Sequence, residues 1–169
     1  MSAPLVVFAV GNPSRGDDAI GPVICGRLAQ WLENEGLADQ VDLIEDFQLN
    51  VEHAIDLQGR GLALFVDAGE NTPAPFIFEP ISPSTASGHT THALPPQAVL
   101  QVYRQMEGRE PPPAFVLCVR GDSFDLGDVL TPAAALRIDA ALHLLHRLCR
   151  HPDRPSWLAL ATQERAAAR

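Results

Sequence analysis

Runs of apolar residues along this chain alternate with stretches in which apolar residues recur at helical spacing. The run LVVFAV at 5–10 has no polar position, which is typical of a strand buried on both faces of a sheet. Ile20, Ile24 and Leu28 recur every four residues, and Gly36 follows, so this stretch predicts a helix. The same criteria predict strands at 5–10, 41–44, 62–66, 76–78 and 114–119, and helices at 20–35, 51–57, 95–106 and 132–150. This alternation predicts a layered α/β sandwich of about five strands with helices on both faces.

The end of the chain departs from this alternation. A chain of 169 residues has room for one domain of ordinary size, and we expect residues 1–150 to form a single α/β domain. The composition changes from His151 onward, and we expect residues 151–169 to be a peripheral or partly disordered tail. Trp157, Leu158 and Leu160 are the residues that could dock this tail onto the domain.

Charge and composition exclude several classes of function. Acidic residues outnumber basic ones by 21 to 12, which gives a formal charge of −9 and argues against nucleic acid or an anionic membrane as a partner. All 12 basic residues are arginines. Without lysine, the chain cannot form a Schiff base, a Walker-type phosphate loop or a Ser-Lys dyad.

The cysteines and the first residues suggest a compartment. Cys25, Cys118 and Cys149 are far apart and form no CxxC pair, so neither a disulfide framework nor a thiolate zinc cluster is predicted. The apolar run near the start is too short for a membrane span, and no basic residue precedes it. We therefore expect a cytoplasmic protein.

Three groups of polar residues follow predicted strands or precede predicted helices, where ligands bind in open α/β sheets. The loop GNPSRGDDAIG after the first strand carries Asp17 and Asp18, whose charges suit a cation better than a phosphate. Asp67 follows the third strand, and His89 and His92 lie in the polar loop before the third helix. Each group also has a simpler structural interpretation: a helix cap for one of the paired aspartates, a turn for Asp67 and a solvated loop for the histidines.

Two other clusters are better explained by structure than by ligand binding. On a helical wheel, His143 and His146 share a polar face with two arginines, which predicts a solvated surface. Cys149 falls on the apolar side of the same helix, where a free cysteine is usually a core residue. His53 and Asp56, three positions apart, are most simply a hydrogen-bonded surface pair.

Taken in order, four motifs resemble those of a known family. They are Gly11-Asn12, GDDAIG at 16–21, VDAG at 66–69 and THALP around His92. The ordered set resembles the hydrogenase maturation proteases, the endopeptidases that remove a C-terminal extension from the large subunit of [NiFe] hydrogenases. The resemblance runs from Val6 to Leu148 and implies a phosphorylase/hydrolase-like, three-layer α/β/α sandwich with a twisted five-stranded sheet.

The resemblance also implies the site. It matches Asp18 and Asp67 to the family's acidic residues, as catalytic and metal-contacting groups, and His92 to its metal-contacting histidine. The implied metal is Ni²⁺, carried by the large-subunit precursor that is the expected partner. Two departures are visible: His89 is an additional histidine, and residues 45–59 replace a segment that is often rich in Gly and Thr. This variant segment looks more like the proteases that serve soluble, NAD-coupled hydrogenases.

Several alternatives stay open at the level of sequence. Two carboxylates and one imidazole suit Ni²⁺, Zn²⁺ or another borderline divalent ion and leave coordination positions free. The metal could belong to the enzyme and activate water, or it could be the nickel already lodged in the precursor. A nickel-binding accessory protein without peptidase activity could use the same residues. A nucleotide-binding domain is disfavoured because the GxGxxG motif and lysine are both missing.

Overall fold

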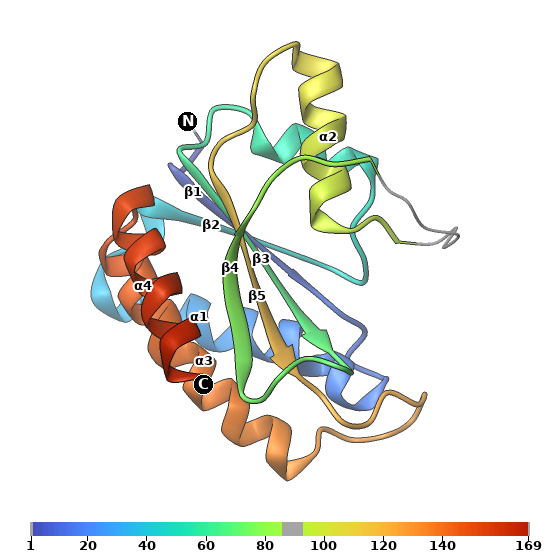
Figure 1. Ribbon diagram of the computed structural model, residues 1–169. Helices are drawn as coiled ribbons and strands as arrows, with labels where there is room; N and C mark the ends of the chain where they lie inside the picture. Colours follow the sequence, from blue (N-terminus) through green and yellow to red (C-terminus); the bar gives the residue numbers. More distant parts are fainter. Residues whose placement is uncertain (1, 86–92, 169) are drawn as a thin grey trace.

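The centre of the protein is a five-stranded mixed sheet, shown in Figure 1; the computed structural model describes residues 2–85 and 93–168. The strands are β1 (Leu5–Val10), β2 (Val41–Asp46), β3 (Leu62–Gly69), β4 (Phe76–Ile81) and β5 (Ala114–Arg120). Their spatial order is β2-β1-β3-β5-β4. Strands β2, β1, β3 and β5 are parallel to one another, and β4 runs antiparallel to β5 at one edge of the sheet. All five predicted strands are therefore present.

Helices cover both faces of the sheet, which confirms the predicted three-layer architecture (Figure 1). The α-helices are α1 (Ile20–Glu35), α2 (Pro96–Glu107), α3 (Pro132–Arg150) and α4 (Arg154–Ala167), and the short 3₁₀ helices are η1 (Gly16–Ala19), η2 (Ala38–Gln40) and η3 (Val51–Leu57). One face carries α1, α3 and α4, and the other carries α2 and η3. Within the described residues, no helix has the length and apolar character needed to cross a bilayer.

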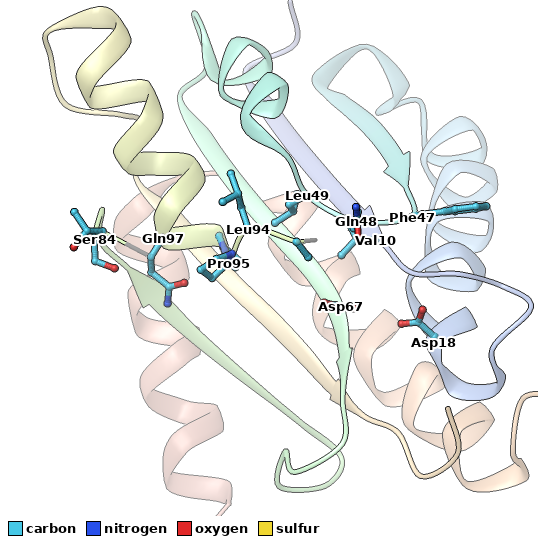
Figure 2. A pocket seen from close by; sticks show the side chains of 13 residues that line it. Val10, Asp18, Phe47, Gln48, Leu49, Asp67, Ser84, Leu94, Pro95 and Gln97 are labelled. Atoms are coloured by element: carbon cyan, nitrogen blue, oxygen red, sulfur yellow. The ribbon is translucent and has the colours of Figure 1, made fainter. Parts of the chain in front are cut away.

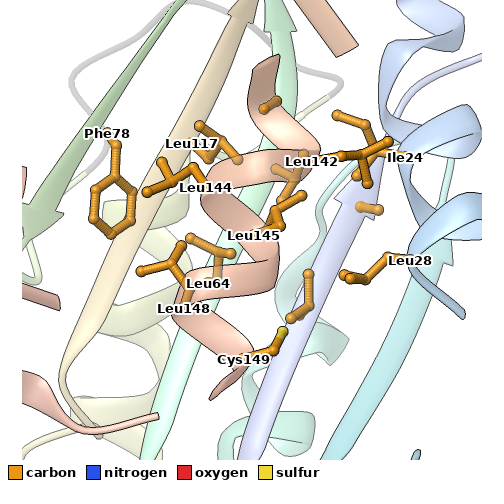
Figure 3. Close-up of a cluster of buried hydrophobic side chains, with 14 of the residues drawn as sticks. Ile24, Leu28, Leu64, Phe78, Leu117, Leu142, Leu144, Leu145, Leu148 and Cys149 are labelled. Carbon is orange, nitrogen blue, oxygen red and sulfur yellow. The ribbon is translucent and has the colours of Figure 1, made fainter. Parts of the chain in front are cut away.

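Side chains that alternate along the strands divide the core into two clusters. In β1, Leu5 and Val7 belong to the cluster under α1, α3 and α4, whereas Val6 and Phe8 belong to the cluster under α2 and η3. Figure 3 shows part of the first cluster, in which leucines of α3 pack against Leu64 of the sheet. All six residues of β1 are buried, as the uninterrupted apolar run predicts.

The strand order places two chain segments side by side at one end of the sheet. β1 has β2 on one side and β3 on the other, so the loop after β1 adjoins the carboxyl end of β3. In open α/β sheets, a crevice forms where the strand order reverses in this way. Asp18 follows β1 and Asp67 lies in β3, so both are expected at this crevice.

The end of the chain is a helix rather than the partly disordered tail that its composition suggested. Asp153 caps α4 by accepting a hydrogen bond from the backbone N–H of Ser156. Trp157 is completely buried, lies against Phe78 and Phe115, and donates a hydrogen bond to the carbonyl oxygen of Leu148. Residues 154–167 thus form an ordered helix, and Trp157 and Leu160, two of the residues named as able to dock it, are buried.

Candidate active site

Two glycines allow the loop after β1 to lie against the start of α1. A Cβ atom on Gly11 would lie 2.0 Å from the carbonyl oxygen of Asp18, and the φ angle of Gly11, +151°, disfavours other residues. A Cβ atom on Gly21 would lie 2.2 Å from the carbonyl oxygen of Val10. The glycines of the GN and GDDAIG motifs are thus explained by close backbone contact, which places Asp18 beside the end of β1.

The adjacent residues Asp17 and Asp18 have separate roles. The carboxylate of Asp18 accepts one hydrogen bond, from the backbone N–H of Asn12 at 2.7 Å, and faces a cavity. Neither aspartate caps α1, whose N-cap residue is Ala19 without a side-chain hydrogen bond. The interpretation of this pair as a simple helix cap is therefore wrong.

Asp17 is fully buried, and other groups of the protein donate hydrogen bonds to its carboxylate. It accepts hydrogen bonds from the backbone N–H groups of Asp122, Ser123 and Thr131 and from the hydroxyl group of Thr131. Burial alone would raise the pKa of Asp17, but these hydrogen bonds together outweigh it and hold the pKa below its usual 3.8. With its oxygens used in this way, Asp17 fastens η1 to the loop between β5 and α3, and only Asp18 is available to a ligand.

Asp67 lies within β3, which continues to Gly69, so it is not a turn residue. Its carboxylate accepts a hydrogen bond from the backbone N–H of Ala68 and faces the same cavity as Asp18. Solvent reaches the side chain through this open cavity, yet the protein around it still disfavours the charged form. Burial raises the pKa of Asp67 to about 7, against a weaker lowering by the Ala68 hydrogen bond, and the charge of Asp18 raises it further.

The cavity has a volume of about 680 Å³ and lies at the carboxyl end of the parallel strands (Figure 2). Asp18 and Asp67 are its only charged residues within the part of the chain that the structure describes. The other lining residues are polar or apolar side chains from β1, the segment after β2 and the approach to α2: Val10, Phe47, Gln48, Leu49, Ser84, Thr85, Ala93, Leu94, Pro95, Pro96 and Gln97. Phe47 is 65% exposed at the rim. The space is large enough for several residues of an extended peptide.

Most of these lining residues were not predicted from the sequence. Phe47 and Gln48 directly follow β2, so the rule that singled out Asp67 would also have found them. Ser84 and Gln97 gave no such signal. They meet at the cavity because the backbone N–H of Ser84 donates a hydrogen bond to the carbonyl oxygen of Gln97.

The two candidate histidines, His89 and His92, lie outside the described residues. The residues that directly follow His92 do line the cavity, and the backbone N–H of Leu94 is bound to the carbonyl oxygen of Leu49. Among the residues that the structure does describe, no group of three or more His, Cys, Asp or Glu residues could hold a metal ion. The assignment of His92 as the third ligand thus stays a prediction.

Of the clusters set aside earlier, one interpretation is confirmed and one is wrong. Cys149 is buried in the core as expected, and burial raises the pKa of its thiol to about 12, so it is not a ligand. His53, by contrast, is not part of a surface pair with Asp56. It is buried, its Nδ1 accepts a hydrogen bond from the backbone N–H of Asn50, and its Nε2 lies 3.4 Å from the carboxylate of Asp46.

Several solved structures have a similar fold. No family model and no curated protein matches the chain. The [NiFe] hydrogenase maturation protease HycI from Thermococcus kodakarensis superposes with a TM-score of 0.66 at 21% identity, over 88% of this chain and 94% of that one. The chain has the fold of the [NiFe] hydrogenase maturation proteases. A solution structure of an endopeptidase from Escherichia coli shares this maturation-protease fold, with a TM-score of 0.63 and 24% identity over 86% of this chain and 90% of that one.

A second enzyme from Escherichia coli extends the comparison. The hydrogenase maturating endopeptidase HybD has a TM-score of 0.62 at 22% identity, with 86% of this chain and 90% of that chain covered. The four short motifs and the arrangement of the backbone indicate the same fold. Together they confirm the fold that the motifs implied.

Proposed function

We propose that this protein is an endopeptidase that removes the C-terminal extension of a [NiFe] hydrogenase large-subunit precursor after nickel insertion. The observation that carries this proposal is the meeting of Asp18 and Asp67, from two separate segments, in one open cavity of the maturation-protease fold. The sequence motifs predict the same two carboxylates. The substrate is a protein, and we place the reaction in the cytoplasm.

The two carboxylates suit hydrolysis of a peptide bond by an aspartyl-type mechanism. In the metal-free protein the pKa of Asp67 is about 7, and a cation beside it favours the ionised carboxylate, the form that acts as a general base. In the ionised form, Asp67 takes a proton from a water molecule, whose oxygen attacks the scissile carbonyl carbon. The proton then passes to the departing amine as the C–N bond breaks. Asp18, held by Asn12, is placed to contact a cation next to the reacting bond.

Nickel enters this proposal as part of the substrate. Asp18 and Asp67 supply two oxygen ligands, and His92 is the expected nitrogen ligand, a set that suits Ni²⁺ and leaves positions free. When the precursor presents its nickel to these residues, the ion neutralises their charges and fixes the scissile bond close to Asp67. One contact then provides both positioning and a check that the metal has been inserted.

The deciding experiment offers purified protease to matched nickel-loaded and nickel-free precursors and follows the intact mass of the precursor. The protease is first treated with chelator, which is then removed. We expect the nickel-loaded precursor to be shortened and the nickel-free precursor to persist. Equal cleavage of both contradicts the nickel check, and failure on both until metal is returned to the protease indicates an intrinsic metallopeptidase.

Asp18→Asn and Asp67→Asn provide the site control for this experiment. Each substitution removes an anionic oxygen with little change in side-chain volume, so we expect processing to be lost while the circular dichroism spectrum is kept. Normal cleavage by both folded variants would remove these residues from the site. Stable binding of the precursor by the wild-type protein without shortening it would instead indicate a nickel-binding accessory protein.

A further inference from the structure

The two faces of the sheet are covered unequally next to Asp67. In β5, Phe115 and Val119 face α3 and α4 and are at most 1% exposed. Val116 and Cys118, which alternate with them and face the side of α2, are only half-buried. Ile77 of the neighbouring strand β4 is half-buried as well. Apolar sheet surface is thus left open beside the proposed catalytic carboxylate.

A second cavity, of about 260 Å³, lies over this open surface. It adjoins the main cavity, because Asp67, Val10, Leu49, Pro96 and Gln97 line both. Its remaining lining residues are predominantly apolar and come from four adjacent strands: Phe8, Phe65, Ile77, Glu79, Val116, Leu117 and Cys118. Strand register explains this lining, since Phe8 pairs with Phe65, Phe65 with Val116, and Asp67 with Cys118. Asp67 therefore stands at the border between a polar cavity and an apolar one.

We propose that the apolar cavity is a side-chain pocket that selects a large aliphatic residue adjoining the scissile bond of the substrate. This inference rests on the proposed peptidase function, which places the reacting bond at Asp67. A residue next to that bond has its side chain within reach of the cavity, and transfer of an aliphatic side chain from water to apolar walls is favourable. Differences of one or two methylene groups in such a pocket change the rate of cleavage about 10- to 100-fold.

Glu79 is the one charged residue besides Asp67 among the described residues of this cavity. It lies on the edge strand β4, where its side chain is exposed, so water solvates its charge without a partner. The buried walls are provided instead by the stacked rings of Phe8 and Phe65, whose centroids are 4.8 Å apart. The cavity thus matches a leucine or methionine side chain better than a lysine or arginine side chain.

Competition between precursors tests the selectivity. Nickel-loaded precursors with Leu, Met, Ala, Glu or Lys on either side of the scissile bond are mixed and cleaved by the intact protein, and the products are counted by mass. We expect Leu and Met to be cleaved about 10- to 100-fold faster than Ala, Glu and Lys at one of the two positions. Equal rates at both positions, or a preference for Lys, would overturn the apolar assignment while leaving the peptidase function intact.

Variants that fill or enlarge the pocket locate the selectivity. Val116→Phe narrows the cavity and should move the preference from Leu toward Ala, whereas Val116→Ala should favour larger side chains. Val129→Phe is the matched control, because it adds the same ring at a position that is 80% exposed. If Val116→Phe does not fold, Ile77→Phe on the edge strand makes the same test. An unchanged preference in all folded pocket variants would refute the proposal.

A binding measurement separates this proposal from the peptidase proposal. We expect the blocked tripeptide acetyl-Ala-Leu-Ala-amide to shift the methyl NMR signals of Val116 and Ile77, and acetyl-Ala-Glu-Ala-amide to leave them unchanged. This result, together with failure to cleave any precursor, would support the pocket and reject the peptidase. Precursor cleavage without any shift of these methyl signals would support the peptidase and reject the pocket.

Discussion

Asp17 and Asp18 are neighbours in the sequence, but the carboxylate of Asp17 stabilises the fold and that of Asp18 is available to a ligand. Asp17 accepts hydrogen bonds from three backbone N–H groups and one hydroxyl group, whereas Asp18 accepts one and faces the cavity. The residue type and the loop were predictable from the GDDAIG motif. The division of roles was not, because the donors that occupy Asp17 come from residues more than one hundred positions later in the chain.

Asp17→Asn should destabilise the protein by about 2–4 kcal/mol at neutral pH, because an amide group cannot accept from all these donors and part of it is left unsatisfied in a buried place. Since the pKa of Asp17 is lowered in the folded state, its stabilisation is present above pH 3.8 and is lost as the pH falls through the folded pKa. Urea denaturation at pH 7 and at pH 3 measures both effects. Asp18→Asn is the control. The carboxylate of Asp18 accepts only one hydrogen bond, so this substitution should lower the free energy of unfolding by less. An equal decrease for the two variants would contradict this account.

Asp67→Asn should have the opposite effect on stability. The folded pKa of about 7 lies above the usual 3.8, so between these values the folded protein holds a proton that the unfolded chain has released, and stability falls as the pH rises. Above pH 7, Asp67 is ionised in the folded protein as well, and the loss of stability that its raised pKa causes has reached its full size. Because solvent reaches the side chain, we expect a gain of only about 1 kcal/mol for the variant at pH 8. Thermal denaturation at pH 4 and pH 8 should show the gain only at the higher pH, and not in the exposed control Asp125→Asn.

At the scale of elements, local sequence signals determined most boundaries. The predicted bounds of α3 agree with the structure because Thr131 caps it and Pro132 occupies its first turn. The predicted bounds of α2 differ from the structure by one residue, and those predicted for the helix at 51–57 agree with η3, where Asn50 is the N-cap residue. The 3₁₀ form of η3 was not predicted. The direction of β4 was not predictable, since its partner β5 follows it by more than thirty residues.

Helix α4 should contribute to stability and not to the reaction. Trp157→Ala removes a fully buried ring on the face of the sheet opposite the cavity, and we expect a loss of about 3–5 kcal/mol in the free energy of unfolding. The rate of precursor cleavage per folded molecule should be unchanged at low temperature. Leu136→Ala, at a position 71% exposed, is the control and should change the unfolding midpoint little. A small loss for Trp157→Ala would show that the tail is peripheral after all.

The segment that leads into α2 yields a prediction about the two histidines. His92 stands three residues before Pro95, and the intervening Ala93 and Leu94 line the cavity. We therefore expect His92→Ala to stop precursor cleavage and His89→Ala to leave it nearly normal, as measured by intact mass. His143→Ala on α3 serves as a surface control. The reverse result would mean that the motif alignment in this loop is shifted by three residues.

At the scale of the whole molecule, the alternation of strands and helices was sufficient to predict the layers. Uninterrupted apolar runs such as Leu5–Val10 identified the central strands, and the strand-end rule identified Asp67. The sequence named Trp157 as a residue that could dock the tail, but neither its contacts with Phe78 and Phe115 nor the second, apolar cavity was predictable. Both depend on contacts between residues that are distant in sequence, and neither leaves a periodic pattern.

The two faces of the sheet are covered unequally by helices, and this difference affects which substitutions the protein can accept during evolution. Three helices seal one face, and one helix with a short 3₁₀ turn covers part of the other. Substitutions in the sealed layer must keep its volume and its apolar character, whereas substitutions in the proposed pocket would change which side chains it accepts. The residues that stabilise the fold and those of the proposed pocket therefore lie on opposite faces of the same five strands. A new substrate preference can arise without repacking the layer that stabilises the molecule.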